Sequence, residues 1–185
     1  DYAKAKLDYE EVLGLCRKVG DRSSTAILLS NLGAIASESG DYPEALRLIQ
    51  EGAALFREVN HPQAVIQATT MLSAVHRALG RFDEARNELC EALDEALRRH
   101  LEHLIPYALF ELSQLHAATG EVETALELME WVVANPSTIG EHKRDGQKLI
   151  AELASRLSPA VVKTIRQRSG EVSPKLVLAR LRAPQ

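Results

Sequence analysis

The side chains that could hold a metal or act as nucleophiles are few and widely separated. His100 and His103 are three residues apart, a spacing that can place two metal ligands on one helical turn. No cysteine lies near them and Glu102 is expected to point elsewhere, so we predict a surface pair beside a turn and no metal site. Cys16 and Cys90 lie inside apolar patterns without a Cys-x-x-Cys pair. We interpret them as small buried hydrophobic residues in a reducing compartment.

Motifs that position a catalytic or phosphate-binding group are also missing. The sequence contains no Gly-x-x-x-x-Gly-Lys, no Gly-x-Ser-x-Gly and no His-Glu-x-x-His. A dense acidic run consists of Glu121, Glu123, Glu127 and Glu130, and its first two members lie where a helix dipole favours negative charge. Catalysis by paired carboxylates would need a pocket that the sequence does not indicate. We therefore predict a protein that is not an enzyme and carries no cofactor.

Glycines mark an internal repeat with a period of 40 residues. The recurring patterns are Gly40-Asp41-Tyr42-x-x-Ala45, Gly80-Arg81-Phe82-x-x-Ala85 and Gly120-Glu121-Val122-x-x-Ala125, and the chain opens in the same phase with Asp1-Tyr2-x-x-Ala5. Four repeat units therefore start at residues 1, 41, 81 and 121. Such self-similarity is the signature of stacked structural repeats.

Each repeat unit is predicted to form a helix, a tight turn and a second helix. Apolar residues with helical spacing precede and follow every marker glycine. Gly40 can reverse the chain at a helix end because it tolerates positive φ. Asp41 is expected to cap the next helix, with Glu44 completing a capping box. With 45% apolar and only 4% aromatic residues, the composition also favours close helix packing, and we predict an all-α protein.

The end of the chain departs from the repeat. A helix at about 122–134 should end at Asn135-Pro136, and Thr138-x-x-Glu141 could form a capping box for a helix that runs to about residue 157. Ser158-Pro159 and Ser173-Pro174 each offer an N-cap followed by proline, which predicts helices at 159–168 and 174–182. We thus expect a repeat array over residues 1–157 and C-terminal capping helices over residues 158–185.

These features resemble the tetratricopeptide repeat (TPR). The matching positions are Leu32-Gly33, Gly40-Asp41-Tyr42 and Ala45, with Leu72-Ser73, Leu112-Ser113, Ala85 and Ala125 in the equivalent slots. The usual TPR period is 34. The 40-residue period looks like the repeats in the sensor regions of bacterial STAND-type signalling ATPases and transcriptional regulators. The resemblance implies a right-handed superhelical array of antiparallel helix pairs, an α-solenoid.

In TPR arrays the first helix of each pair, the A helix, lines a concave binding face. A helices are expected here at about 22–39, 62–79 and 103–119. Carried over by phase, the resemblance implies a protein- or peptide-binding groove that contains Asn31, Glu38, Gln67, Thr70, Met71, Arg77, Tyr107, Phe110, Glu111 and Gln114. Because Arg77 is the only cation in the set, we do not expect capture of a C-terminal carboxylate. Tyr107 and Phe110 are either binding anchors or core residues, and both interpretations remain open.

Other aromatic and imidazole side chains are expected to pack. His76 and His116 occupy equivalent slots in successive repeats and are predicted to be half-buried packing residues. Trp131 is expected to pack in the core or the cap.

Charge is unevenly distributed along the chain. Residues 1–155 contain 15 Lys and Arg against 25 Asp and Glu, a net charge of −10, whereas residues 156–185 contain 7 against 1, a net charge of +6. The basic end is either a solvated helix surface or a nucleic-acid contact, and it faintly resembles the first helices of a LuxR-type helix-turn-helix. The resemblance lacks a recognition helix, so nucleic acid is not the favoured partner.

Taken as a sequence, the chain is expected to be a protein–protein interaction scaffold or sensor module. We expect a cytoplasmic fragment of a larger bacterial signalling or regulatory protein, with a protein or peptide ligand and no membrane segment. An array that begins in the middle of a repeat leaves an apolar end open, so self-association is a further alternative.

Overall fold

The computed structural model describes residues 2–182, with side chains from Lys6 onward, and within these residues every regular element is a helix. The helices are α1 (Tyr2–Val19), α2 (Arg22–Glu38), α3 (Tyr42–Glu58), α4 (Pro62–Ala78), α5 (Phe82–Arg98), η1 (Glu102–Leu104), α6 (Ile105–Ala118), α7 (Val122–Ala134), α8 (Gly140–Ser155), α9 (Pro159–Arg168), η2 (Ser169–Glu171) and α10 (Pro174–Arg182). The all-α class predicted from the sequence is confirmed. The chain forms two compact units, Asp1–Arg81 and Phe82–Gln185.

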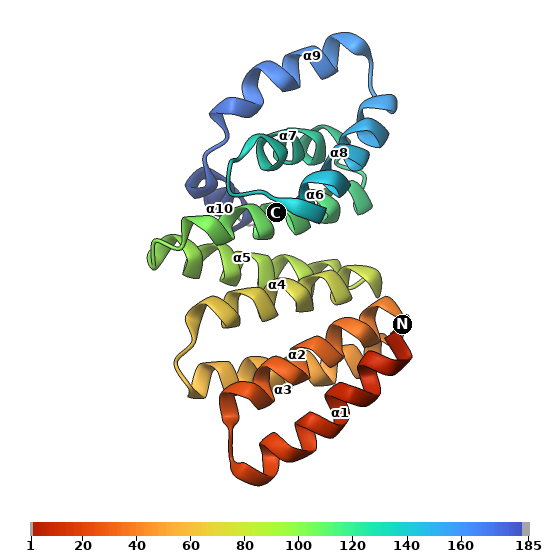
Figure 1. Ribbon diagram of the computed structural model, residues 1–185. Coiled ribbons are helices and arrows are strands. Elements are labelled where there is room, and N and C mark those ends of the chain that lie inside the picture. The colour runs from red at the N-terminus through yellow and green to blue at the C-terminus, as the bar shows by residue number, and fades with distance from the viewer. Residues whose placement is uncertain (1, 183–185) are drawn as a thin grey trace. The chain divides into compact units, whose positions relative to one another are not determined.

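The first unit stacks α1 on α2, α2 on α3 and α3 on α4 as antiparallel neighbours (Figure 1). The A helices α2 and α4 also contact each other. We call α1, α3, α5 and α7 the B helices. Leu29 of α2 and Ile49 of α3 are almost fully enclosed in the core of this unit. Glycine lets these helices approach closely, because a Cβ on Gly33 would lie 2.5 Å from Cγ1 of Ile49.

Chain reversals occur at intervals of twenty residues, half the period found in the sequence. The residues with positive φ include Gly20, Gly40, Asn60, Gly80, His100 and Gly120. At Gly40 the reversal is closed by two backbone hydrogen bonds: the Gly40 N–H donates to Ser37 O at 3.1 Å and the Asp41 N–H donates to Ala36 O at 2.9 Å. Because asparagine and histidine tolerate the left-handed region better than most residues, Asn60 and His100 can replace glycine in the intervening turns.

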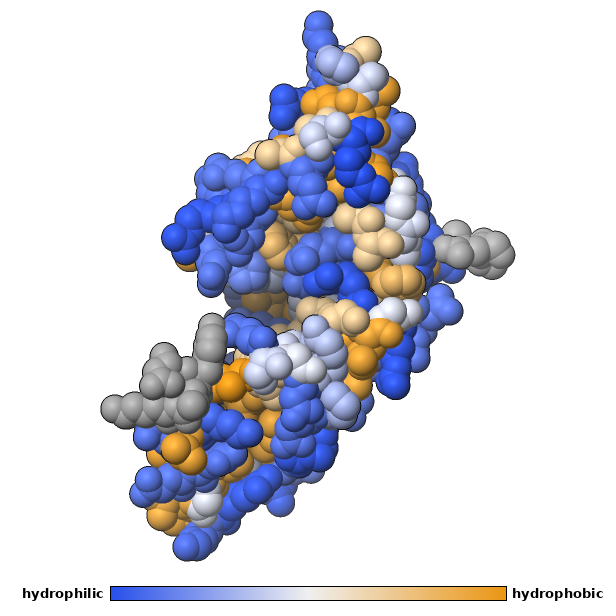
Figure 2. All heavy atoms as spheres, turned by 90° about the vertical axis from the view of Figure 1, so that its right-hand side faces the viewer, coloured by the Kyte–Doolittle hydropathy of each residue, from blue (hydrophilic) through white to orange (hydrophobic). Residues whose placement is uncertain are grey.

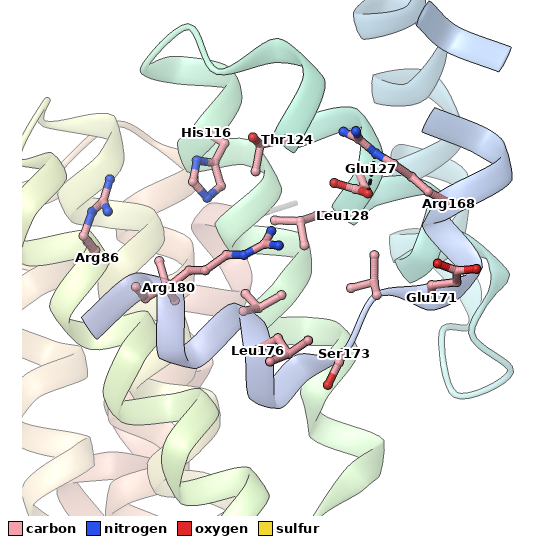
Figure 3. Close-up of a pocket in the computed structure, with 13 residues that line it drawn as sticks. Arg86, His116, Thr124, Glu127, Leu128, Arg168, Glu171, Ser173, Leu176 and Arg180 are labelled. Atoms are coloured by element: carbon pink, nitrogen blue, oxygen red, sulfur yellow. Dashed lines mark ion pairs between the residues drawn. The ribbon is translucent and has the colours of Figure 1, made fainter. Parts of the chain in front are cut away.

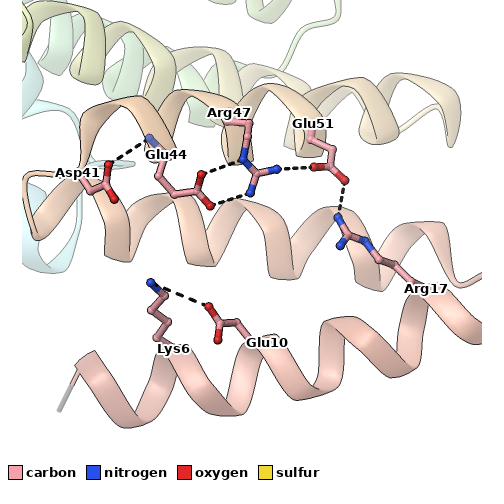
Figure 4. Close-up of polar contacts among 7 residues, drawn as sticks. All are labelled: Lys6, Glu10, Arg17, Asp41, Glu44, Arg47 and Glu51. Carbon is pink, nitrogen blue, oxygen red and sulfur yellow. Dashed lines mark hydrogen bonds and ion pairs between the residues drawn. The ribbon is translucent and has the colours of Figure 1, made fainter.

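The helix after Gly40 begins with only half of the predicted capping box. Asp41 caps α3 by accepting a hydrogen bond from the Glu44 N–H at 3.3 Å. The Glu44 carboxylate does not return to the Asp41 N–H, because it binds Arg47 at 2.8 Å and 2.6 Å instead. Arg47 also reaches Glu51, which pairs with Arg17 of α1 at 2.5 Å (Figure 4). This network links the B helices α1 and α3 along the surface of the first unit.

In the second unit α5 packs on α6, and α6 packs on α7. Helix α8 packs on α7 and also on α6, whereas α9 and η2 pack on α7. Helix α10 then returns to α5 (Figure 1). The predicted bounds of α9 and α10 agree with the structure, and Ser158 caps α9 by accepting a hydrogen bond from the Val161 N–H at 3.4 Å.

The capping box predicted at Thr138 and Glu141 is wrong. Helix α8 begins at Gly140, its N-cap is Ile139, and no side chain caps its first turn. Thr138 lies one residue before the cap, and its side chain is buried, with only 4% of its surface exposed. The preceding turn explains why the N-cap is Ile139 and not Thr138. In this turn the Thr138 N–H donates to Asn135 O and the Ser137 N–H donates to Asn135 Oδ1.

Gly52→Ala should destabilise the first unit, whereas Gly14→Ala should stabilise it. A Cβ at Gly52 would meet Ser30 Oγ at 2.8 Å and Ala26 O at 3.1 Å, so α2 and α3 would have to separate. We expect a loss of about 1–3 kcal/mol in the free energy of unfolding. Gly14 lies inside α1 with nothing within 4 Å of the added Cβ. Its replacement should add up to about 1 kcal/mol through helix propensity. Urea unfolding followed by circular dichroism measures the free energy of unfolding of both variants. An equal change in this free energy for Gly52→Ala and Gly14→Ala would contradict the close contact at Gly52.

Candidate functional site

The predicted binding residues of the first unit differ in their accessibility. Glu38 at the end of α2 and Gln67 on α4 are exposed, and Asn31 on α2 is half-buried. Thr70 is only 8% exposed, and its hydroxyl donates to Ile66 O of its own helix at 2.9 Å. Asn31, Glu38 and Gln67 are therefore the polar groups of this set that a ligand can reach most directly.

The two remaining predicted residues of the first unit are half-buried. Met71 packs against the hydrophobic core, so only part of its side chain is available to a ligand. Arg77 lies near the end of α4 and is likewise half-buried.

The aromatic pair on α6 packs against α8 in the second unit. The ring of His142 meets Tyr107 edge-on, with centroids 4.9 Å apart, and Phe110 at 5.1 Å. Phe110 is only 8% exposed, whereas Tyr107 is half-buried. Phe110 is thus a packing residue, whereas Tyr107 stays partly accessible to solvent.

The other two predicted residues of α6 interact with each other. The Gln114 side-chain amide donates to Glu111 Oε1 at 3.2 Å, and both side chains are half-buried. A ligand that binds here would have to compete with this hydrogen bond or accept from the second N–H of Gln114.

His116 is more deeply buried than the sequence suggested. It is 8% exposed, and its Nδ1 lies 3.0 Å from Glu121 Oε2 without ideal hydrogen-bond geometry. Burial lowers the pKa of His116 below its ordinary value of 6.5, and the opposing charge of Glu121 does not offset this effect. The imidazole is consequently neutral at pH 7.

The basic end of the chain pairs with the acidic B helices. Arg166 binds Glu130 and Arg168 binds Glu127, each at 2.7 Å, and Arg182 lies 3.1 Å from Asp94 of α5. These contacts join α9 to α7 and α10 to α5. Sequence reasoning identified the acidic run and the basic end separately but did not connect them.

No constellation of catalytic or metal-ligating side chains is found among residues 6–182. No group of three or more His, Cys, Asp and Glu in that range could hold a metal ion. Cys16 and Cys90 are free and half-buried rather than fully buried, and desolvation raises the pKa of the Cys90 thiol. Among the described helices, none combines the length and the apolar character that a membrane crossing requires.

Comparisons with known proteins agree on the repeat type. Family models described as tetratricopeptide repeat match residues 1–58, 24–96 and 106–131. No curated protein matches the sequence significantly. Among solved structures, BtubC (BKLC) from P. vanneervenii is similar over 100% of this chain and 77% of its own, with a TM-score of 0.67 and 17% identity. A putative kinesin light chain with TPR-like repeats from Podosopora anserina is similar over 98% of this chain and 87% of its own, with a TM-score of 0.59 and 20% identity. At these identities the likeness shows the fold alone.

Acidification should weaken the fold through His116. Because the pKa of His116 is lower in the folded than in the unfolded chain, the unfolded chain binds a proton first as the pH falls below about 6.5. The free energy of unfolding should therefore decrease between about pH 7 and pH 5, and this part of the decrease should be absent in His116→Gln. Urea unfolding at several pH values in this range measures the free energy of unfolding of each protein. His103→Gln, which removes an exposed imidazole, is the control, and an equal pH dependence in wild type and His116→Gln would contradict the assignment.

Proposed function

This chain belongs to the tetratricopeptide repeat family, whose repeats generally mediate protein–protein interaction, and from that premise we propose a module that binds a peptide segment along its A helices. The observation that carries the proposal is that the polar side chains of Asn31, Glu38 and Gln67 are at least partly accessible on the contacting helices α2 and α4. Side-chain amides such as these offer both a donor and an acceptor to a peptide backbone.

The exposed carboxylate of Glu38, at the end of α2, favours a basic ligand. Lysine or arginine side chains of a peptide would be attracted to this carboxylate, which would increase the rate of association more than the final affinity.

The place of this module in a larger system is also part of the proposal. We infer a sensor or signalling role in the bacterial cytoplasm, and the support for it is the 40-residue repeat period together with the missing catalytic motifs. The division into a repeat array at 1–157 and basic capping helices at 158–185 is retained as a proposal. Nucleic-acid binding has less support, because Arg166, Arg168 and Arg182 of the basic end are engaged by acidic side chains.

A second candidate function is association of two copies through α1. Val12, Leu15 and Val19 share one side of this helix at helical spacing and are 45%, 56% and 78% exposed. Leu13, on another side, is buried in the core of the first unit. Hydrophobic atoms reach the surface of this unit in the lower part of Figure 2.

Loss of the accessible amides should weaken peptide binding. A basic peptide selected from a displayed random library against the whole chain would be titrated calorimetrically against wild type and Asn31→Ala/Gln67→Ala. We expect a loss of affinity on the order of tenfold, since each lost hydrogen bond contributes about 0.5–1.5 kcal/mol. Gln50→Ala/Asn87→Ala removes a matched pair of exposed amides from the B helices α3 and α5 and should bind like wild type. Failure to select any peptide, or equal binding by both variants, would contradict the proposal.

Replacing the central residue of the exposed α1 surface should abolish self-association. In sedimentation equilibrium, wild type should associate in a concentration-dependent way and Leu15→Asp should remain monomeric, because the charge would have to be desolvated at the contact. Ile139→Asp is the control, since Ile139 is 68% exposed before α8. A monomeric wild type would eliminate this second candidate.

A further inference from the structure

The return of α10 to α5 forms a cavity that opens to solvent within the second unit. Its volume is about 340 Å³, and its walls come from α5, α6, α7, the end of α9, η2, α10 and the segment that leads from η2 into α10 (Figure 3). This volume lies in the range of about 300–1,000 Å³ that is typical of small-molecule pockets. The cavity is separate from the predicted residues of the A-helix face, none of which lines it.

The walls combine an apolar surface with cationic side chains. Leu128 of α7 and Leu176 and Leu181 of α10 supply apolar contacts, and Arg86 of α5 and Arg180 of α10 supply positive charge. Leu176 is 61% exposed as the structure stands, so a ligand could bury it. An apolar wall with a few polar groups is the usual composition of a ligand pocket.

The charges of the cavity do not all compensate one another. Arg168 is neutralised by Glu127 at 2.7 Å. Arg180, in contrast, makes no hydrogen bond or ion pair with any residue of the described chain. Figure 3 shows the Arg180 side chain extending from α10 toward the part of the cavity where His116, Thr124 and Leu128 lie. An arginine fork is suited to bind a carboxylate or phosphate through two parallel hydrogen bonds.

We propose that this cavity binds a small organic anion, a carboxylate or phosphate attached to an apolar body. Arg180 binds the anionic group, with the Thr124 hydroxyl as a neighbouring donor, and the apolar body lies against Leu128 and Leu176. Glu127 is held by Arg168 and therefore repels the anion less than a free carboxylate would. The other carboxylate of the lining, Glu171 of η2, lies on the side of the cavity away from Arg180 (Figure 3). This function is additional to peptide binding and uses different residues.

Ligand binding should also hold α10 in place. Helix α10 is attached by the buried Leu178 and by the ion pair between Arg182 and Asp94. A ligand that contacts both α7 and α10 adds a further link between them. Trp131, the single tryptophan of the chain, lines a neighbouring cavity together with Pro174 and Lys175 at the start of α10. Its fluorescence therefore reports on the position of this helix.

The test uses the whole chain and eight-carbon probes. Octanoate and octyl phosphate would be titrated calorimetrically and by Trp131 fluorescence, with octanamide as the uncharged analogue and inorganic phosphate as the anion without an apolar body. We expect saturable one-to-one binding of octanoate or octyl phosphate and at least about tenfold weaker binding of octanamide and inorganic phosphate. The tighter of the two anionic probes identifies the carboxylate or the phosphate as the group recognised.

Two variants and a matched control assign the binding to this cavity. Arg180→Gln should weaken binding of the anionic probe at least about tenfold. Leu176→Asp, at an exposed position, should weaken it through charge repulsion and loss of apolar contact. Arg166→Gln removes an arginine that pairs with Glu130 outside the cavity and should bind like wild type. Circular dichroism verifies that each variant is folded.

Three results would overturn the proposal. The first is the absence of saturable binding by either anionic probe. The second is equal affinity for octanoate and octanamide, which would show that charge is not recognised. The third is unchanged affinity in both folded variants, Arg180→Gln and Leu176→Asp, which would place the probe elsewhere.

Discussion

The helix packing of both units depends on one backbone constraint. A residue in the left-handed conformation, with positive φ, recurs every twenty positions. A helix that ends with this conformation can reverse within two or three residues, so the next helix starts beside the previous one. At Gly40 and Gly120 the positive φ values of 81° and 87° are accessible without a Cβ penalty. Asn60 and His100 adopt the same conformation with φ of 53° and 56°. Because His100 serves this turn, its closeness in sequence to His103 needs no metal-binding explanation.

The sequence was sufficient to predict the helix pairs because the signals that mark helix ends and turns in the repeats agreed with the fold. The glycine markers, the Asp41 cap and the Ser158-Pro159 start all lie where the structure has a turn or a helix start. The small residues Ala45, Ala85 and Ala125 are completely buried, as close packing of neighbouring helices requires. The twenty-residue interval was harder to see, since two of its turns use asparagine and histidine in place of glycine.

Long-range contacts explain what the sequence could not decide. Phe110 and Tyr107 could be core or groove residues by their spacing alone, and the position of α8, which brings His142 against both rings, determines the outcome. The charge of the basic end could be counted from the sequence. Its partners could not, because Arg166 and Arg168 meet their partners only where α9 packs on α7, and Arg182 meets Asp94 only because the segment 169–173 directs α10 back to α5. The repeat phase predicted the positions of the amides on α2 and α4. It could not predict their ligand, because no local sequence pattern identifies one.

The ion pairs of the C-terminal helices relate the charge distribution to the two proposed sites. Exposed ion pairs contribute little individually, typically less than about 1 kcal/mol. Their effect here is positional, because they bring arginines over the acidic helix α7 and leave Arg180 without an ion pair among the described residues, beside apolar side chains. The A helices lack this compensation at Glu38, which stays exposed and negative. A single chain can thus attract a cationic peptide to Glu38 on α2 and a small anion to Arg180 at its C-terminal cavity, since these two side chains differ in the sign of their charge.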